Sequence, residues 1–153
     1  MSERPIGIVA GLETDRPDWL LDIFVRLATR DIHIPITLFI NGMLVSGEIV
    51  TVVQYLEGIG GSLSNATFST GTLVVDNNSL SMVQAAFQTT ADALADDYKR
   101  EIEKQDRITT SGYIHLANAH IFSAAGEALS SGPGVYWRGW LKSVNGFVLG
   151  VPK

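Results

Sequence analysis

The sequence predicts an α+β fold: a small, strongly bent, five-stranded antiparallel β-barrel with an N-terminal helix and a long inserted helix. The hydrophobic period is 3.6 near the N-terminus, changes to 2 over residues 33–59, and returns to 2 after residue 109. Two Asn-Gly pairs, at 41–42 and 145–146, each separate two β-rich runs, which is typical of hairpin turns.

The N-terminal helix is predicted from a capped apolar stripe. Asp15 can cap the helix and Pro17 suits its first turn. Apolar residues then repeat at i, i+3, i+4 and i+7, which predicts one buried face made of Leu20, Ile23, Phe24 and Leu27. We expect residues 1–13 to form a flexible arm and residues 14–153 to form a single domain.

The first Asn-Gly pair predicts a type I′ hairpin, because both turn positions of that type need positive φ. A two-residue loop fixes the register, and the pairs that share a face are Ile40 with Met43, Leu38 with Val45, and Ile36 with Gly47. We assign this face, continued by Ile49, to the core. Gly47 lies inside the second strand and permits the sharp bend that a small barrel needs.

The middle of the chain is predicted to be a loop followed by one long helix. Residues 58–71 are rich in Gly, Ser and Thr and are interpreted as a loop. A helix over about 79–106, inside a helical insertion at about 76–107, has an apolar stripe and a charged face. This pattern fits a helix packed on its own barrel and also a helix that packs on a partner.

The C-terminal part predicts a strand over 113–122 and a second Asn-Gly hairpin, with Val144 opposite Phe147. Alternation assigns four residues to the core: Val135, Trp137, Gly139 and Leu141. The opposite face is aromatic and cationic, and its residues are Tyr136, Arg138, Trp140 and Lys142. Arg138 can lie against Tyr136 or Trp140. This candidate interaction face fits packing on the domain's own helix, a protein interface, or a nucleic-acid platform.

Composition and motifs argue against catalysis and against cofactors. The chain has no cysteine. His115 and His120 are five residues apart on one predicted strand, so they should point to opposite faces and share no metal. No nucleophile-elbow or phosphate-loop motif occurs. We therefore expect no enzyme activity, no catalytic residue, no metal and no cofactor.

The charge balance argues against nucleic acid. The net charge is −5, and residues 110–153 hold Arg138, Lys142 and Lys153 against Glu127. Two or three cations cannot form the continuous stripe that binds phosphates. No apolar run approaches the ~18 residues of a membrane span, and the N-terminus lacks the pattern of a signal peptide. We expect a soluble cytoplasmic protein without membrane or nucleic-acid partners.

The order of the elements resembles that of Sm-like small barrels, in which a helix precedes a bent meander of strands. An inner glycine marks the first half of such barrels and an Arg-Gly step marks the second, and here Gly42, Gly47 and Arg138-Gly139 match. The resemblance implies an Sm-like or SH3-like barrel. The sequence departs from the family where its RNA-contacting loop would lie, between residues 53 and 58, and carries about fifty inserted residues between the halves.

A closer resemblance is to the gas vesicle accessory protein U family. It rests on DIHIPITLFINGMLVSGEIV at 31–50 and on YIHLANAHIFSAAG…GVYWRGWLKSVNGFVLG within 113–150. The resemblance implies a cytoplasmic, gas vesicle-associated, non-enzymatic protein that supports assembly or organisation of the vesicle shell. Its partners would be the shell or other vesicle accessory proteins, and the exposed edge strands of such a barrel favour a homo-oligomer. An Sm-like nucleic-acid-binding module is the alternative function.

Overall fold

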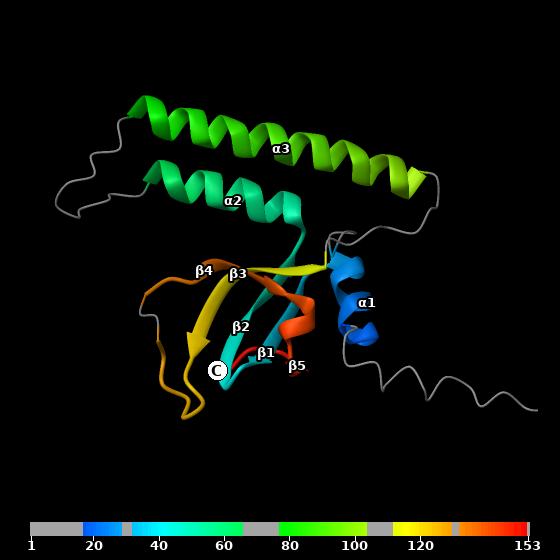
Figure 1. The fold of residues 1–153 in the computed structure, drawn as a ribbon, viewed down its shortest axis with the longest axis vertical. Coiled ribbons are helices and arrows are strands. Elements are labelled where there is room, and N and C mark those ends of the chain that lie inside the picture. Colours follow the sequence, from blue (N-terminus) through cyan, green and yellow to red (C-terminus); the bar gives the residue numbers. More distant parts are fainter. Residues whose placement is uncertain (1–16, 29–31, 66–76, 104–111, 130–131, 153) are drawn as a thin grey trace, which may run out of the picture.

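In the part of the chain that the structure describes, three α-helices accompany one antiparallel sheet (Figure 1). The structure is a computed structural model, and it describes residues 17–28, 32–65, 77–103, 112–129 and 132–152. The elements are α1 (Trp19–Ala28), β1 (Ile34–Ile40), β2 (Met43–Val50), α2 (Val52–Asn65), α3 (Asn77–Glu103), β3 (Tyr113–Phe122), β4 (Val135–Trp140), the 3₁₀ turn η2 (Leu141–Ser143) and β5 (Gly146–Leu149). None of these helices combines the length and the apolar character that a membrane crossing requires. The predicted arm at 1–13 lies outside the described residues.

The five strands form one sheet in the order β4-β3-β2-β1-β5. All four neighbouring pairs are antiparallel. The α+β class and the five-stranded antiparallel sheet are therefore confirmed. The sheet is not closed into a barrel, because β4 pairs with β3 and β5 with β1, and these two end strands do not pair with each other. The Sm-like or SH3-like barrel is thus not confirmed.

The first hairpin forms as predicted. Asn41 and Gly42 have φ of 48° and 79°, as the type I′ turn demands. The three predicted pairs of β1 and β2 are all present. Five residues of the predicted core face are buried, namely Ile36, Leu38, Ile40, Val45 and Ile49, whereas Met43, directly after the turn, is 40% exposed.

The hydrophobic core lies between the sheet and α1. We call the sheet face that carries Ile36, Leu38 and Ile49 the inner face, and the opposite one the outer face. Leu21 and Ala28 of α1 are buried with the inner-face residues, and the Phe24 ring meets Phe147 edge-on with 5.8 Å between centroids. The predicted buried stripe of α1 is therefore displaced by one position.

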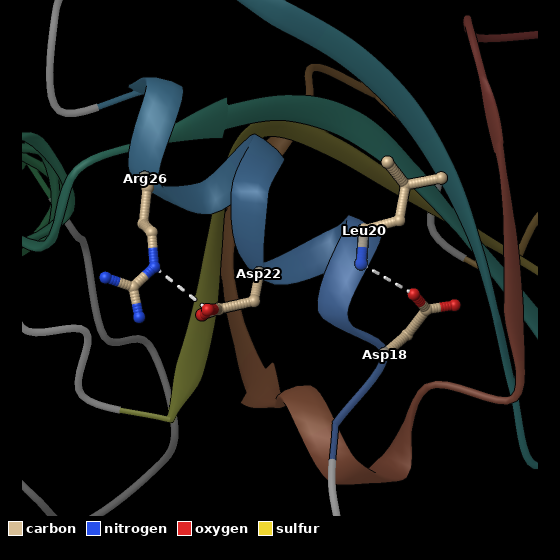
Figure 2. A network of polar contacts seen from close by, with 4 residues as sticks. All are labelled: Asp18, Leu20, Asp22 and Arg26. Atoms are coloured by element: carbon tan, nitrogen blue, oxygen red, sulfur yellow. Dashed lines mark hydrogen bonds and ion pairs between the residues drawn. The ribbon is translucent and has the colours of Figure 1, made fainter. Parts of the chain in front are cut away.

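The displacement has a simple cause in the sequence of α1. Residues 21, 24, 25 and 28 repeat with the same spacing as the predicted set and are also apolar, so periodicity alone does not separate the two stripes. Leu20 and Ile23 are 38% and 42% exposed. The cap is Asp18, whose Oδ1 accepts the Leu20 N–H at 2.8 Å (Figure 2). Asp15 lies outside the described residues.

Figure 2 also shows the ion pair on α1 between Asp22 and Arg26, one helical turn apart. The Arg26 Nε lies 2.9 Å from the Asp22 Oδ2, and both side chains are partly exposed. An i, i+4 pair of this kind stabilises a helix by only a few tenths of a kcal/mol. The packing of the apolar stripe on the sheet therefore fixes α1 more than this pair does.

The loop predicted at 58–71 is wrong over residues 58–65, because residues 52–65 form α2. Residues 66–71 of that prediction lie outside the described part of the chain. Thr51 and Gln54 form a capping box at its start: the Gln54 N–H donates to the Thr51 Oγ1 at 3.1 Å, and the Thr51 N–H donates to the Gln54 Oε1 at 3.0 Å. This box offsets part of the helix-weakening effect of the three glycines in α2. The inserted part is thus a pair of helices, lying side by side at one end of the sheet (Figure 1).

The long helix α3 packs mainly against α2. Gly60 of α2 is buried and faces Phe87 and Gln84 of α3, and a Cβ at this position would be in ordinary contact with both. Ala91 is fully buried, whereas Met82 on the same helix is 75% exposed. Most of the described surface of α3 is therefore open.

The prediction of a second hairpin at Asn145-Gly146 is wrong. Residues 141–143 form η2 after β4, and β5 then pairs with β1, with Phe147 opposite Leu38. Asn145 does not form a two-residue turn: its N–H donates to the Phe39 carbonyl at 2.8 Å, and its Oδ1 accepts the Asn41 N–H at 2.9 Å. The side chain of Asn145 thus ties the end of the chain to the turn of the first hairpin.

Candidate protein-interaction surface

The candidate surface is built on β4, at one edge of the sheet. Strand alternation places Tyr136, Arg138 and Trp140 on the outer face, and Trp137 packs against the core on the inner face. Trp140 is 53% exposed and Tyr136 is 39% exposed. Lys142 is exposed but lies beyond the strand, in η2, so the structure does not align it with the other three.

A fourth residue, Tyr113, joins this surface from β3. Tyr113 is paired with Trp140, and the two rings are 4.3 Å apart between centroids with 31° between their planes. The Arg138 Cζ lies 3.7 Å from the centroid of the Tyr113 ring. We call Tyr113, Tyr136, Arg138 and Trp140 the aromatic surface.

The sequence placed Arg138 against Tyr136 or Trp140, whereas it lies on Tyr113. Tyr113 and Arg138 come from different strands and are diagonal neighbours in the β3–β4 ladder, where long and aromatic side chains reach each other. Their contact therefore depends on the register of two strands that are joined by a long connection. The aromatic residue that opens the strand at 113–122 was visible in the sequence, but nothing in the sequence set that register.

The helix α2 covers one end of this surface. Gly58 lies against the Tyr136 ring, and a Cβ at that position would overlap the ring. Tyr55 meets Tyr136 edge-on, with 6.3 Å between centroids and 77° between planes. Tyr136 is therefore partly packed on the protein's own helix, while Trp140 keeps a larger exposed fraction.

His115 lies beneath Tyr55, next to the aromatic surface. It is paired with Arg138 on one side and with Val50 on the other, and it is 4% exposed. Its Nε2 is buried without a hydrogen-bond partner in the described part of the chain. Burial, and secondarily the charge of Arg138, lowers the pKa of His115 from 6.5 to about 4. The imidazole is consequently neutral at physiological pH.

The predicted divergence of His115 and His120 is wrong. The register pairs Glu48 with Ala117 but Ser46 with His120, so β3 carries one extra residue between these pairs. Asn118 takes up this bulge with φ of 49°. Strict alternation would put His120 on the inner face. The extra residue turns it to the outer face, which His115 also occupies. Among the described residues, no three His, Asp or Glu side chains are grouped closely enough to hold a metal ion.

The chemistry of the aromatic surface is that of recognition. It offers two large exposed rings and one guanidinium whose position is held by a ring contact. Tyr, Trp and Arg are the residues that most often dominate binding energy at protein interfaces. The rings also lie on an edge strand, where a further chain can approach.

One family model matches the chain. The model of the gas vesicle protein GvpU-like family covers residues 18–152 of the 153. No significant match was found among the curated proteins or the solved structures. The family is one of gas vesicle accessory proteins and is not a known enzyme family. Since the match spans nearly the whole chain, this protein belongs to the gas vesicle protein GvpU-like family.

Proposed function

We propose that this protein is a non-enzymatic accessory protein of gas vesicles that acts in the assembly, or in the organisation and clustering, of the vesicle shell. It acts through protein–protein contacts, and the aromatic surface carries the principal one. The observation that supports this role is the exposed Trp140 ring stacked on the half-buried Tyr113 ring, with Arg138 over Tyr113, at an edge strand of the sheet.

The physical properties of the surface favour a protein partner. Stacked, partly exposed rings lose little conformational entropy on binding, because their positions are already held by neighbours. The one guanidinium has a partner ring and adds directional hydrogen bonds. The overall net charge of −5 disfavours nucleic acid, whose affinity depends on neutralising many phosphates.

The partners in this proposal are the vesicle shell or other vesicle accessory proteins, in the cytoplasm, with the protein itself in a homo-oligomer. Self-association fits β4 because an edge strand presents unpaired backbone groups to a second copy. Several weak contacts acting together on a repetitive shell would also raise the avidity, by about 10²–10⁴-fold when tethered.

The proposal is tested by co-sedimentation with purified gas vesicles and by analytical ultracentrifugation. The variant is Trp140→Ala with Arg138→Ala. Its matched control is Trp19→Ala with Arg100→Ala, because Trp19 is 72% exposed on α1 and the Arg100 side chain is 66% exposed on α3. We expect the first variant to stay folded but to lose vesicle association and oligomers at tens of micromolar, and the control to behave as the wild type.

Two results would contradict the proposal. If both double variants associate equally well with vesicles, the aromatic surface is not the interface. If the wild type is a strict monomer at tens of micromolar, self-association is wrong. A salt-dependent RNA shift that the Trp140 and Arg138 variant loses would favour the nucleic-acid function instead.

A further inference from the structure

A cleft of about 500 Å³ opens on the outer face of the sheet, apart from the aromatic surface. Its wall is built from β1, β2 and β3 and from the residues that follow β5. Polar groups come from Ser46, Glu48, Asn118 and His120, and apolar walls come from Phe122 and Val151 among others. None of the four residues of the aromatic surface lines it. This cleft therefore represents a second feature that the proposed function leaves unused.

The bulge in β3 lies at the cleft, because Asn118 and the opposing Gly47 both line it. A Cβ at Gly47 would come 2.9 Å from the Ala117 carbonyl oxygen and 3.2 Å from the Ala119 Cα. The absent side chain lets the two strands approach closely at the point where Asn118 adopts its positive φ. The extra residue in β3 then restores His120 to the face that Ser46 and Glu48 occupy.

Each polar group of the cleft can accept a hydrogen bond: the Glu48 carboxylate only accepts, whereas the Ser46 hydroxyl, the Asn118 amide and the His120 ring can each also donate. The Glu48 carboxylate is partly exposed, and its Oε1 lies 2.7 Å from the His33 Nδ1. The His120 Nδ1 lies 3.1 Å from the Asn118 carbonyl oxygen, which can only accept, so this nitrogen carries the proton. In the neutral ring the Nε2 is then an acceptor. No lysine or arginine lines the cleft in the described part of the chain.

Acceptors beside apolar walls select a ligand with several donors, a positive charge and an apolar stem. A guanidinium has five N–H donors in one plane, stacks on aromatic rings and forms charge-assisted bonds with carboxylates. We infer that this cleft binds the guanidinium of an arginine side chain presented by a partner polypeptide. Glu48 supplies the charge, Asn118 and His120 supply acceptors, and Phe122 supplies the ring. The inference is independent of the proposed function.

The test is a titration of the full ¹⁵N-labelled chain, followed by NMR. The probe is N-acetylarginine N-methylamide, which has no charged termini, and its counterpart is the citrulline analogue, which has the same shape with a neutral urea. We expect weak binding, with amide shifts centred on Glu48, Asn118 and His120. The citrulline analogue should bind at least about tenfold more weakly, since it loses a charge-assisted bond.

Variants localise the effect. Glu48→Gln keeps the shape and removes the charge, and we expect it to weaken binding of the capped arginine at least about tenfold. Glu57→Gln is the matched control, because Glu57 is exposed on α2 and does not line the cleft. The Trp140→Ala and Arg138→Ala variant should bind the probe as the wild type does, which separates this cleft from the aromatic surface.

Three outcomes would overturn the inference. Equal binding of the arginine and citrulline probes to the wild type excludes a charge-selective cleft, and this comparison needs no variant to fold. Shifts centred away from the cleft, or equal binding by Glu48→Gln in a spectrum that remains dispersed, exclude the assigned residues. Tighter binding of free arginine than of the capped probe would replace the partner polypeptide by the free amino acid.

Discussion

The ring of Tyr55 on α2 lies on the imidazole of His115 on β3, with 4.7 Å between ring centroids and 50° between planes. His115 is 4% exposed, and its Nε2 has no hydrogen-bond partner in the part of the chain that the structure describes. The contact between α2 and the sheet at this point is thus one of packed rings. It depends on an imidazole that stays neutral.

The first prediction is a loss of stability in acid that His115 causes. Folding lowers the pKa of His115 from 6.5 to about 4, so between these values the unfolded chain binds a proton that the folded chain does not. As far as His115 is concerned, the free energy of unfolding should therefore be highest above pH 6.5 and should fall as the pH drops toward 4. At about 1.4 kcal/mol per pH unit across that window, the loss is about 3 kcal/mol.

The measurement is denaturant unfolding of the wild type and of His115→Phe at several pH values. The variant keeps a ring under Tyr55 and cannot be protonated, so the difference between the two proteins isolates this group. That difference should change by about 3 kcal/mol between pH 7.5 and pH 4. Parallel pH curves for the wild type and His115→Phe would contradict the prediction.

The second prediction compares two glycines of α2. Alanine stabilises the interior of a helix by about 1 kcal/mol relative to glycine. A Cβ at Gly61 has no neighbour within 4 Å, so Gly61→Ala should gain most of this amount. A Cβ at Gly58 would overlap the Tyr136 ring, so Gly58→Ala must displace that ring and should lose the gain.

Urea unfolding followed by circular dichroism would check the pair. We expect Gly61→Ala to be more stable than Gly58→Ala by at least about 1 kcal/mol. If both variants gain the same free energy of unfolding, the Tyr136 ring can leave its place against Gly58 without cost, and the prediction is contradicted. Adding Tyr136→Ala to both should bring the two stabilities together, because it removes the ring that distinguishes them.

Sequence reasoning succeeded where structure is local. The first hairpin follows from a two-residue turn and from alternation, and its register was predicted pair by pair. The strand at 113–122 was also predicted with its observed ends. Both depend on neighbours in the chain. The Thr51 and Gln54 capping box was equally local and would have indicated α2, but the glycines that follow it suggested a loop.

Sequence reasoning failed where distant segments compete. Asn145-Gly146 has the composition of a hairpin turn, but β5 pairs with β1 instead of β4, and there Phe147 packs against the core beside Phe24. The bulge at Asn118 reversed the predicted face of His120, because strict alternation assumes a regular ladder. Of the candidate site, the three residues on β4 were predicted to share a face, whereas Tyr113 depends on register and was missed.

The third prediction concerns the capping box of α2. Thr51→Val keeps the shape of the side chain and removes the Oγ1 that accepts the Gln54 N–H. Loss of such a cap costs about 0.5–2 kcal/mol. Thr89→Val is a control on α3, where the hydroxyl is exposed and bonds a carbonyl one turn earlier. Chemical denaturation should show that Thr51→Val lowers the free energy of unfolding more than Thr89→Val does. An equal effect of the two substitutions would contradict the prediction.

The last prediction is that Gly47 is required for the bulge between β2 and β3. A Cβ at Gly47 would press on the Ala117 carbonyl oxygen at 2.9 Å and on the Leu116 Cβ and the Ala119 Cα at 3.2 Å. Two of these three atoms belong to the backbone of a central strand, so they cannot move aside cheaply. We expect Gly47→Ala to lower the free energy of unfolding by about 1–3 kcal/mol, as overpacking of a core does.

The matched control for Gly47→Ala is Gly146→Ala on β5, where a Cβ would have no neighbour within 4 Å and φ is not positive. It should leave the free energy of unfolding unchanged or raise it, because alanine reduces the entropy of the unfolded chain.

The comparison also reports on the cleft: a register without the bulge would turn His120 away from Glu48, so Gly47→Ala should weaken binding of the capped arginine probe while Gly146→Ala does not. If Gly47→Ala is as stable as Gly146→Ala and binds the probe normally, the close approach at Gly47 does not hold the bulge in place.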